Sequence, residues 1–292
     1  ITERVSAMRA LFGPAGNSDP FSEEVGKSSL KAPAWLREIG LDVYEYQCGN
    51  GVHIGDSTAG ELGKEARRHN IAISLHSPYY ISMSNPEFLE KNIGYVLQSC
   101  RALKNMGGRR IVVHSGSVAG RTRTEAMAEA RKTLRCVLKA MDESGYSDMV
   151  LCPETMGKIK QLGDLEEVLE LCSLDERLIP CIDFGHLYAR SLGEIEGYEK
   201  TAAIFDTMEH ALGRERTSVF HSHFSKIEYS KGGEKKHLTF GQNEFGPDFR
   251  PVARIIVERG YTPTFICESA GTQSEDALEM KRIYLEELTR HG

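Results

Sequence analysis

Residues 71–117 read IAISLHSPYYISMSNPEFLEKNIGYVLQSCRALKNMGGRRIVVHSGS, and this stretch contains the pattern that decides the fold. Two short runs rich in apolar and β-branched residues, 71–78 and 110–117, flank a segment of helical period at 86–107. Asn85 before Pro86 is suited to cap the start of that helix. A strand, a helix and a second strand in this order predict a βαβ unit with parallel strands.

The same unit recurs along the whole chain, and a helical segment at 274–292 closes it. The predicted strands are 9–16, 42–49, 71–78, 110–117, 149–155, 178–186, 218–225 and 262–269. Eight strand-helix units in 292 residues match a single (β/α)8 barrel, or TIM barrel, whose typical size is about 250 residues. We therefore expect one domain spanning 1–292, with a doubly wound open sheet as the alternative.

Polar residues decide between these two architectures, because nearly all of them lie at the C-terminal end of a predicted strand. In a barrel these ends form one rim that holds the active site, whereas in an open sheet they spread along an edge. The residues concerned are His76, His114, Glu154, Asp183, His186, His221, His223 and Glu268. Their shared location favours a barrel with its site at the C-terminal rim.

Each of these residues has an ordinary structural explanation, since Glu154 could cap a helix and Asp183 with His186 could close a turn. Together they indicate a metal centre, because burial of so many polar groups without a partner would cost several kcal/mol each. Imidazoles and carboxylates without thiolate suit Zn²⁺ or Mn²⁺, and the candidates exceed the ligands of one ion, so we expect two or three ions. Paired metals clamp the attacking and leaving oxygens at phosphorus, which makes phosphoester hydrolysis the leading chemistry.

Composition limits the setting of this chemistry. No apolar run approaches the roughly 18 residues of a membrane span, and the first residues lack the pattern of a signal peptide, so we expect a cytoplasmic protein that is not associated with membranes. Seven scattered cysteines without a CxxC pair predict reduced thiols. A net charge of −6 gives no global attraction to nucleic acid, so a phosphate substrate would need local lysines or bound cations. No feature indicates a protein partner.

Residues 220–237, FHSHFSKIEYSKGGEKKH, combine three histidines with four lysines. Strand alternation places His221 and His223 on one face, and Phe220 and Phe224 on the face toward the helices. We expect His221 to be the ligand and His223 to be a reserve candidate. His237 is expected on a loop made mobile by two glycines. The lysines are expected to hold a substrate phosphate beside the metals, or else to belong to a solvated loop; they are Lys226, Lys231, Lys235 and Lys236.

The succession HSPYY, VVHSG, PETMG, CIDFGH and ICES, with a His-rich turn before the last, resembles the endonuclease IV family of trinuclear-zinc apurinic/apyrimidinic endonucleases. The resemblance implies one zinc held by His76, His114 and Glu154, with Glu154 bridging to a second zinc. It further implies that Asp183, His221 and Glu268 complete the second site, and that His186 and His237 contribute to a third. Glu154 and Glu268 are then the catalytic carboxylates.

Members of that family cleave the DNA backbone on the 5′ side of an abasic site with a metal-bound hydroxide, and they push side chains into the duplex to swing the abasic nucleotide out. Extrusion is easiest where base pairing is already lost. Tyr79 and Tyr80 occupy the position of a DNA-inserting loop of the family, so the resemblance implies that they contact substrate. Packing of the two rings on a neighbouring loop is the structural alternative.

Two positions depart from the family pattern. Where the family has an Asp two residues before the histidine of the His-rich turn, this chain has Lys235, and a lysine ammonium does not coordinate metal. The third site is therefore weakened or rebuilt, with Glu234 or His223 as the available ligands. The loop after the second strand, QCGNGVHIG, lacks the arginine expected to wedge into DNA.

A sugar isomerase or epimerase of the xylose-isomerase-like superfamily is the alternative function, acting on a small sugar or sugar phosphate. Glu154, Asp183, His221 and Glu268 resemble the four ligands of a single-Mn²⁺ epimerase, and the two glutamates could act as acid and base beside a carbonyl. His186 would then touch the substrate. This interpretation leaves three residues without a role, namely His76, His114 and His237, so the number of bound metals separates the two functions.

Overall fold

The eight apolar runs predicted as strands all form strands in the computed structural model, which describes residues 9–291. The strands are shorter than the predicted runs because each run includes the loop residues that follow its strand. The barrel strands are β1 (Leu11–Pro14), β2 (Val43–Gln47), β3 (Ala72–His76), β4 (Arg110–Val113), β5 (Val150–Pro153), β6 (Cys181–Asp183), β7 (His221–Phe224) and β10 (Thr264–Cys267).

These strands close into a barrel rather than an open sheet. All pairings among them are parallel, in the orders β1-β10-β7-β6 and β2-β3-β4-β5. The two halves are joined by single parallel bridges, Ala15 to Glu45 at one seam and Glu154 to Cys181 at the other. The predicted (β/α)8 barrel is therefore confirmed, and the doubly wound alternative is wrong.

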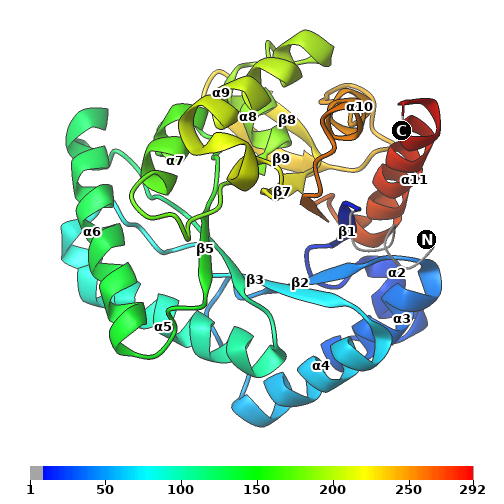
Figure 1. The fold of residues 1–292 in the computed structure, drawn as a ribbon, viewed down its shortest axis with the longest axis horizontal. Helices are drawn as coiled ribbons and strands as arrows, with labels where there is room; N and C mark the ends of the chain where they lie inside the picture. The colour runs from blue at the N-terminus through cyan, green and yellow to red at the C-terminus, as the bar shows by residue number, and fades with distance from the viewer. Residues whose placement is uncertain (1–8, 292) are drawn as a thin grey trace.

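Helices surround the strands on the outside of the barrel (Figure 1). The sequence marks several of their starts: Asn85 caps the 3-10 turn that leads into α5, and both Thr122 and Asp164 form capping boxes, which satisfy two helical N–H groups reciprocally. The helices are α2 (Asp19–Glu24), α3 (Ala32–Ile39), α4 (Asp56–His69), α5 (Leu89–Met106), α6 (Arg123–Glu143), α7 (Leu165–Cys172), α8 (Phe184–Arg190), α9 (Gly197–Thr217), α10 (Arg250–Arg259) and α11 (Gln273–His291), with 3-10 turns η1 (Ser29–Lys31) and η2 (Pro86–Phe88).

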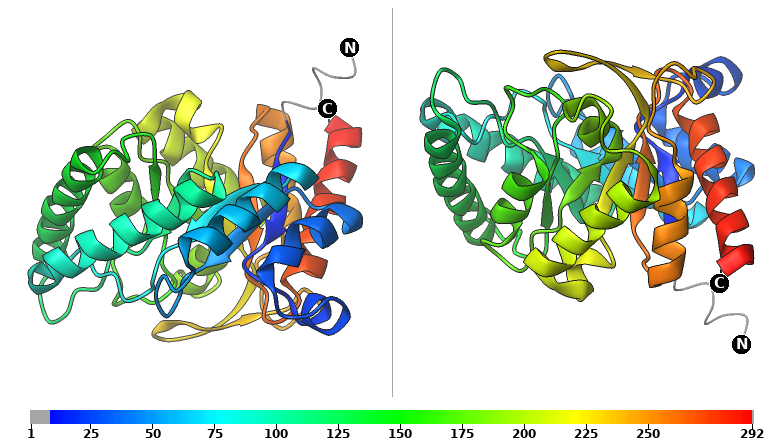
Figure 2. Two further views of the ribbon diagram at one scale, coloured as in Figure 1. Left: turned by 90° about the horizontal axis from the view of Figure 1, so that it is seen from below. Right: turned by 90° about the horizontal axis from the view of Figure 1, so that it is seen from above.

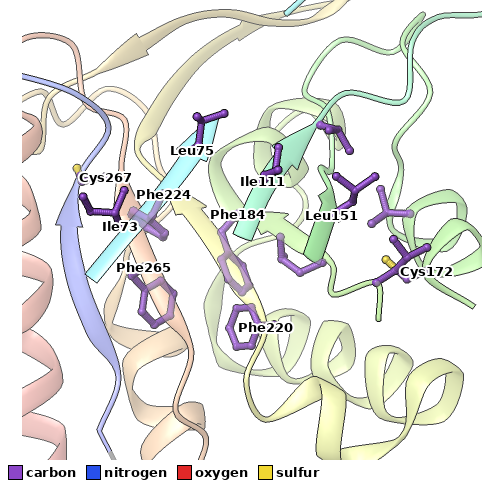
Figure 3. Packing of buried hydrophobic residues seen from close by; sticks show 14 of the residues in the cluster. Ile73, Leu75, Ile111, Leu151, Cys172, Phe184, Phe220, Phe224, Phe265 and Cys267 are labelled. Atoms are coloured by element: carbon purple, nitrogen blue, oxygen red, sulfur yellow. The ribbon is translucent and has the colours of Figure 1, made fainter. Parts of the chain in front are cut away.

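The hydrophobic core fills the layer between strands and helices (Figure 3). Phe220, directly before β7, and Phe224 at its end are fully buried there, and their ring centroids lie 6.3 Å and 6.4 Å from that of Phe184 on α8. This confirms that the two phenylalanines face the helices, as strand alternation predicts. Burial of each such ring stabilises the fold by about 1.5–3 kcal/mol. The histidines between them therefore point into the barrel.

A two-stranded antiparallel hairpin follows β7, formed by β8 (Lys226–Ser230) and β9 (Gly233–Leu238). It projects from the same end of the barrel as α2, whereas the C-terminal end of α11 lies at the opposite end (Figure 2). His237 lies within β9, so the expectation of a mobile loop is wrong. Gly233 has a φ of +90°, and a Cβ there would lie 2.2 Å from the carbonyl oxygen of Gly157. The glycine thus lets the hairpin dock closely on the loop after β5.

None of the helices in the described part of the chain is both long enough and apolar enough to cross a bilayer. All seven cysteines are unpaired thiols, and six of them are buried.

Candidate metal centre

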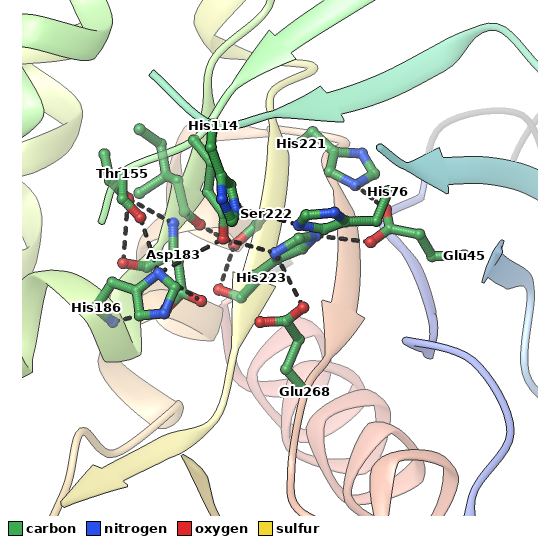
Figure 4. Close-up of polar contacts among 12 residues, drawn as sticks. Glu45, His76, His114, Thr155, Asp183, His186, His221, Ser222, His223 and Glu268 are labelled. Carbon is green, nitrogen blue, oxygen red and sulfur yellow. Dashed lines mark hydrogen bonds and ion pairs between the residues drawn. The ribbon is translucent and has the colours of Figure 1, made fainter. Parts of the chain in front are cut away.

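The C-terminal ends of the barrel strands deliver their polar side chains to one pocket of about 390 Å³ (Figure 4). His76 ends β3, while His114, Glu154 and Glu268 directly follow β4, β5 and β10. The pocket is lined by Gln47, His76, Tyr79, His114, Glu154, Met156, Lys158, Gln161, His186, Glu234, His237 and Glu268. Residues from five strand ends, the start of α8 and the hairpin thus meet at one site.

The first ligand group consists of His76, His114 and Glu154, whose ligand atoms all lie within 4.8 Å of one another. Oε2 of Glu154 is 3.4 Å from Nε2 of His76 and 3.1 Å from Nε2 of His114. Nδ1 of His76 lies 2.7 Å from the Ser77 carbonyl, to which it donates, and this leaves Nε2 with its lone pair toward Glu154. The structure brings these three residues together as the resemblance implies.

The second group consists of Glu154, Asp183, His223 and Glu268, again within 4.8 Å. Nδ1 of His223 lies 3.0 Å from Oε1 of Glu154 and 3.4 Å from Oε1 of Glu268. Asp183 is fully buried; its Oδ1 accepts a hydrogen bond from the backbone N–H of His186, while its Oδ2, 3.3 Å from Nδ1 of His186, has no hydrogen-bond partner among the described residues. A buried carboxylate oxygen without a donor is costly unless a cation lies beside it.

His221 is not part of this second group, so the structure places His223 rather than the expected His221 beside the converging carboxylates. The nearest carboxylate to His221 is Glu45, at 2.8 Å from Nε2, deep in the barrel. Both histidines point inward, but His223 lies two residues closer to the C-terminal end of β7, where the carboxylates converge. His221 does share a group with Cys181 and His223. Burial raises the pKa of the Cys181 thiol well above its usual value, which disfavours the thiolate needed for coordination.

The third group consists of His186, Glu234 and His237. Oε2 of Glu234 lies 3.5 Å from Nε2 of His186, and its Oε1 lies 3.8 Å from Nε2 of His237. His186 donates from Nδ1 to the Thr155 carbonyl at 2.9 Å, and Nδ1 of His237 is hydrogen-bonded to the Ser225 hydroxyl at 2.8 Å. Both rings therefore keep Nε2 for the carboxylate. In this group a carboxylate lies beside the two imidazoles, and it comes from Glu234 rather than from the position of Lys235.

A β-bulge explains how Glu234 and His237 meet although they are three residues apart. In a regular strand they would point to opposite faces. In the hairpin, Lys236 pairs with Glu228 and Glu234 with Tyr229, so Lys235 is an extra, unopposed residue. Such a bulge shifts the alternation by one. As a result Glu234 and His237 face the pocket together.

The predicted substrate-binding lysines do not line this pocket. Lys235 and Lys236 both pair with Glu228 on the outer side of the hairpin, at 3.3 Å for Lys236. Nζ of Lys226 donates to the carbonyls of Phe240 and Gln242 and to the side chain of Asn243. The expectation for these three residues is therefore corrected. Among the described lining residues, Lys158 contributes the one lysine or arginine side chain, and it is exposed.

The two tyrosines separate into one that lines the pocket and one that packs beside it. Tyr79 is 54% exposed and lines the pocket mouth, where its ring lies against Gly49. Tyr80 packs edge-on against Tyr95, with ring centroids 4.8 Å apart. Tyr79 therefore lines the pocket, whereas Tyr80, which is 43% exposed, lies outside it.

Glu45 is a residue of the centre that the sequence analysis missed. It is fully buried on β2, where its carboxylate contacts both His221 and His223. Burial alone would raise the pKa of Glu45, but the two imidazoles, His223 first, lower it well below its usual value. The available signal was a carboxylate in the middle of the buried run VYEYQ, where an unpaired charge is not tolerated.

The electrostatics of the pocket suit a cation. Burial alone would raise the pKa of Glu154, but the histidines around it lower it well below its usual value. Burial alone would lower the pKa of His186, yet Asp183, Glu154 and Glu234 raise it to about 9. A divalent cation among these groups would compete with protons on the imidazoles, so zinc affinity is expected to rise with pH.

The donor set fits zinc. Imidazole nitrogens and carboxylate oxygens are its usual ligands besides thiolate, and each group has the three or four protein ligands of a zinc site. Four histidines are each fixed through one ring nitrogen by an oxygen acceptor or hydroxyl, which is the outer-shell arrangement found around metal-bound imidazoles. These are His76, His186, His223 and His237.

Comparisons with known proteins agree with this geometry. The family model described as xylose isomerase-like TIM barrel matches residues 33–288. An uncharacterized protein of Methanocaldococcus jannaschii is 33% identical over 273 residues, which cover 93% of this chain and 96% of the relative. A probable endonuclease 4 of Mycoplasma pneumoniae is 28% identical over 62% of this chain and 63% of its own length.

Among solved structures, a D-tagatose 3-epimerase-like protein matches with a TM-score of 0.70 at 18% identity, over 96% of this chain and 98% of its own. At that identity the match establishes the fold alone. The resemblance to endonuclease IV is confirmed at the level of relatedness, and the barrel it implies is the one observed. The chain therefore belongs to the xylose isomerase-like TIM barrel family.

Proposed function

We propose that this protein is a zinc-dependent phosphodiesterase that hydrolyses the DNA backbone on the 5′ side of abasic sites. The observation that carries the proposal is the presence of three adjoining ligand groups, two of which share Glu154. A single-metal enzyme needs the second group alone. It has no use for His76 and His114, or for a hairpin whose bulge turns Glu234 and His237 into the pocket.

In the proposed reaction, Glu154 and Glu268 have different roles. Glu154 joins the first two groups through its two oxygens, with Oε2 toward His76 and His114 and Oε1 toward His223. Bound zinc would supply Lewis-acid activation of water and would neutralise charge on the phosphate. Glu268 is half-buried and faces His223 from the pocket side, which places it to accept a proton from the attacking water.

The position of Lys158 is an argument for a substrate that carries a phosphate. This residue directly follows the Gly157 that docks on the hairpin, and its backbone forms a bridge with Gly233. Its exposed ammonium borders the pocket, next to the third ligand group. In an acidic protein such a local cation can attract and hold a phosphate beside the metals. Lys158 thus takes the role that the sequence analysis expected of the hairpin lysines.

The choice of abasic DNA rests on two supports. A relative named probable endonuclease 4 is 28% identical over 62% of this chain, and Tyr79 stands exposed at the pocket mouth, where a flat ring can stack on a base or fill an abasic gap. A DNA substrate and seven unpaired thiols both fit a cytoplasmic protein.

An isomerase or epimerase acting on a sugar or sugar phosphate is the second candidate. The second ligand group favours it, because Glu154, Asp183, His223 and Glu268 form a complete set for one Mn²⁺, and the D-tagatose 3-epimerase-like structure has the same fold. In this function Glu154 and Glu268 would move a proton beside a carbonyl.

One experiment separates the two functions. Purified protein loaded with zinc or manganese is incubated with a duplex bearing a synthetic abasic site, and with a panel of ketoses. The proposal predicts cleavage on the 5′ side of the lesion and no sugar interconversion. An intact duplex together with an interconverted ketose would replace the proposal with the second candidate.

A further inference from the structure

The carboxylate of Glu45 is enclosed by hydrogen-bond donors below the metal centre (Figure 4). Its Oε2 accepts from Oγ of Ser74 and from Nε2 of His221, both at 2.8 Å. Its Oε1 lies 2.9 Å from Nε2 of His223 and 3.2 Å from Nε2 of Gln47. Each oxygen thus has two donors, which is the full capacity of a carboxylate group.

The backbone of Glu45 is fixed on both sides of β2. It pairs with Ser74 of β3, and its carbonyl accepts a hydrogen bond from Gly16 at 2.9 Å across the seam to β1. A side chain on such a strand has little freedom, because its Cβ direction is set by the two neighbours. The pairing of β2 with its neighbouring strands therefore fixes the position of the carboxylate.

This carboxylate determines what the His223 ring can do. A neutral imidazole has one N–H and one lone pair. In the neutral form of the ring that can bind a metal, Nε2 donates to Glu45, so the lone pair is on Nδ1, which faces Glu154 and Glu268 in the second ligand group. Loss of the acceptor would free the ring to rotate or to move its proton to Nδ1, and either change removes the lone pair from the ligand position.

His221 holds the other side of Glu45. Its Nε2 donates to Oε2, whereas its buried Nδ1 has no hydrogen-bond partner among the described residues. A histidine tied to the protein through one carboxylate, and outside the group formed with Asp183 and Glu268, is suited to anchor that carboxylate.

We propose that Glu45 is a positioning residue that fixes the orientation and tautomer of His223 for metal binding, and that His221 is the second anchor of Glu45. The proposal rests on the metal centre of the proposed function but not on the identity of its substrate. It adds a residue from β2, a strand that supplies no ligand, to the machinery of the centre.

The test measures zinc affinity in the absence of any substrate, by competition with a chelating dye. Glu45→Met removes both acceptor oxygens but keeps an unbranched side chain of similar length. Its affinity for one zinc is expected to fall by about 10–100-fold, the usual effect of removing an outer-shell partner. Ser74→Ala is the matched control, because it removes a donor to the same carboxylate without touching a histidine, and its affinity is expected to stay within about threefold of the unmodified protein.

Two further readouts distinguish positioning from a merely structural role. The visible absorption of the cobalt-loaded protein is expected to change in Glu45→Met, because the ligand field reports the His223 bond. Nitrogen NMR of the zinc-loaded protein is expected to show His223 with its proton on Nε2, and a mixture of states after the substitution. Unchanged affinity and unchanged cobalt spectrum in a folded Glu45→Met protein would overturn the proposal.

If Glu45→Met does not fold, the zinc affinity of Glu45→Gln tests the proposal instead. The amide keeps one acceptor oxygen, so it can serve only one imidazole, and a smaller loss of affinity, about threefold or more, is expected. Affinity equal to that of the unmodified protein would overturn the proposal. Because zinc binding is measured directly, failure to cleave abasic DNA would contradict the proposed function and leave this result standing.

Discussion

The strand ligands and the hairpin group differ in how the chain builds them. The strand ligands, defined as His76, His114, Glu154, Asp183, His223 and Glu268, lie at the ends of barrel strands, and four of them are almost fully buried. The hairpin group, defined as His186, Glu234 and His237, depends on β8 and β9, and its two hairpin members are half-exposed. The barrel strands position the first set, whereas the second depends on a β-bulge and on the packing of the hairpin against α8 and the loop after β5.

Because of this difference, the strand ligands and the hairpin group are expected to lose their metals separately. Strand ends are held by neighbouring strands and by the surrounding helices, so their ligands are preorganised. The hairpin packs on α8 and on the loop after β5, where Glu234 donates its N–H to the Gly157 carbonyl at 3.1 Å and Ile159 donates to Gly232. Metal held there is expected to leave first.

The largest effect is expected at the residue that belongs to both strand groups. Glu154→Gln removes the charge that joins them, and the rate of backbone cleavage should fall on the order of 10³-fold or more, because the electrostatic stabilisation of the reaction is lost. Cleavage of a labelled abasic duplex measures this. Thermal unfolding of the metal-free variant serves as the control, and retained activity would place the chemistry elsewhere.

The two β7 histidines give the sharpest contrast within the barrel. His223→Ala should lose one strongly bound zinc and most of the activity, on the order of 10²-fold, because it removes a ligand. His221→Ala should keep the full zinc count with a smaller loss, since it removes only an anchor of Glu45. Metal analysis of both purified variants reads this out directly. Loss of zinc in His221→Ala but not in His223→Ala would restore the order expected from the sequence.

Two neighbouring glycines test the hairpin group alone. Gly233→Ala introduces a Cβ at a φ of +90° that would lie 2.2 Å from the Gly157 carbonyl oxygen, so the hairpin must shift. Gly232→Ala adds a methyl group that meets only Ser230 Oγ at 3.9 Å. We expect Gly233→Ala to release one zinc and to slow cleavage about 10-fold, while Gly232→Ala changes neither. Equal behaviour of the two variants in metal analysis would argue against a docked hairpin.

The smallest effect is expected at the pocket mouth, where the proposed function assigns Lys158 to the phosphate rather than to a metal. Lys158→Ala should raise the substrate concentration needed for half-maximal cleavage by about 5–10-fold, with unchanged zinc content, because one exposed charge contact is lost. Lys160 is also exposed but does not line the pocket, so Lys160→Ala is the matched control. Steady-state cleavage at several salt concentrations checks this, and equal effects of both variants would remove Lys158 from the phosphate site.

The same contrast explains what could be predicted from the sequence. Apolar strand runs recur along the chain, and a polar residue marks the end of most of them. The barrel could therefore be predicted, together with the positions of His76, His114, Glu154, Asp183 and Glu268. The order of His221 and His223 could not, because alternation places both inward and only the length of β7 decides which one reaches the rim. The bulge at Lys235 leaves no sequence signal, so the sequence offers Glu234 only as one of two available ligands and does not show that the hairpin lysines point away from the pocket. Glu45 lies in the middle of β2, so it falls outside the strand-end pattern that marks the other residues.

The central claim is that this centre holds more than one metal, in two parts of unequal strength. Its most direct test is the zinc content per chain during stepwise dialysis against a chelator, measured by inductively coupled plasma mass spectrometry. The account predicts close to three ions at the start, an early fall to two as the hairpin group empties, and a starting value near two in Glu234→Ala. A single ion per chain in the undialysed protein, unchanged in Glu234→Ala, would contradict it.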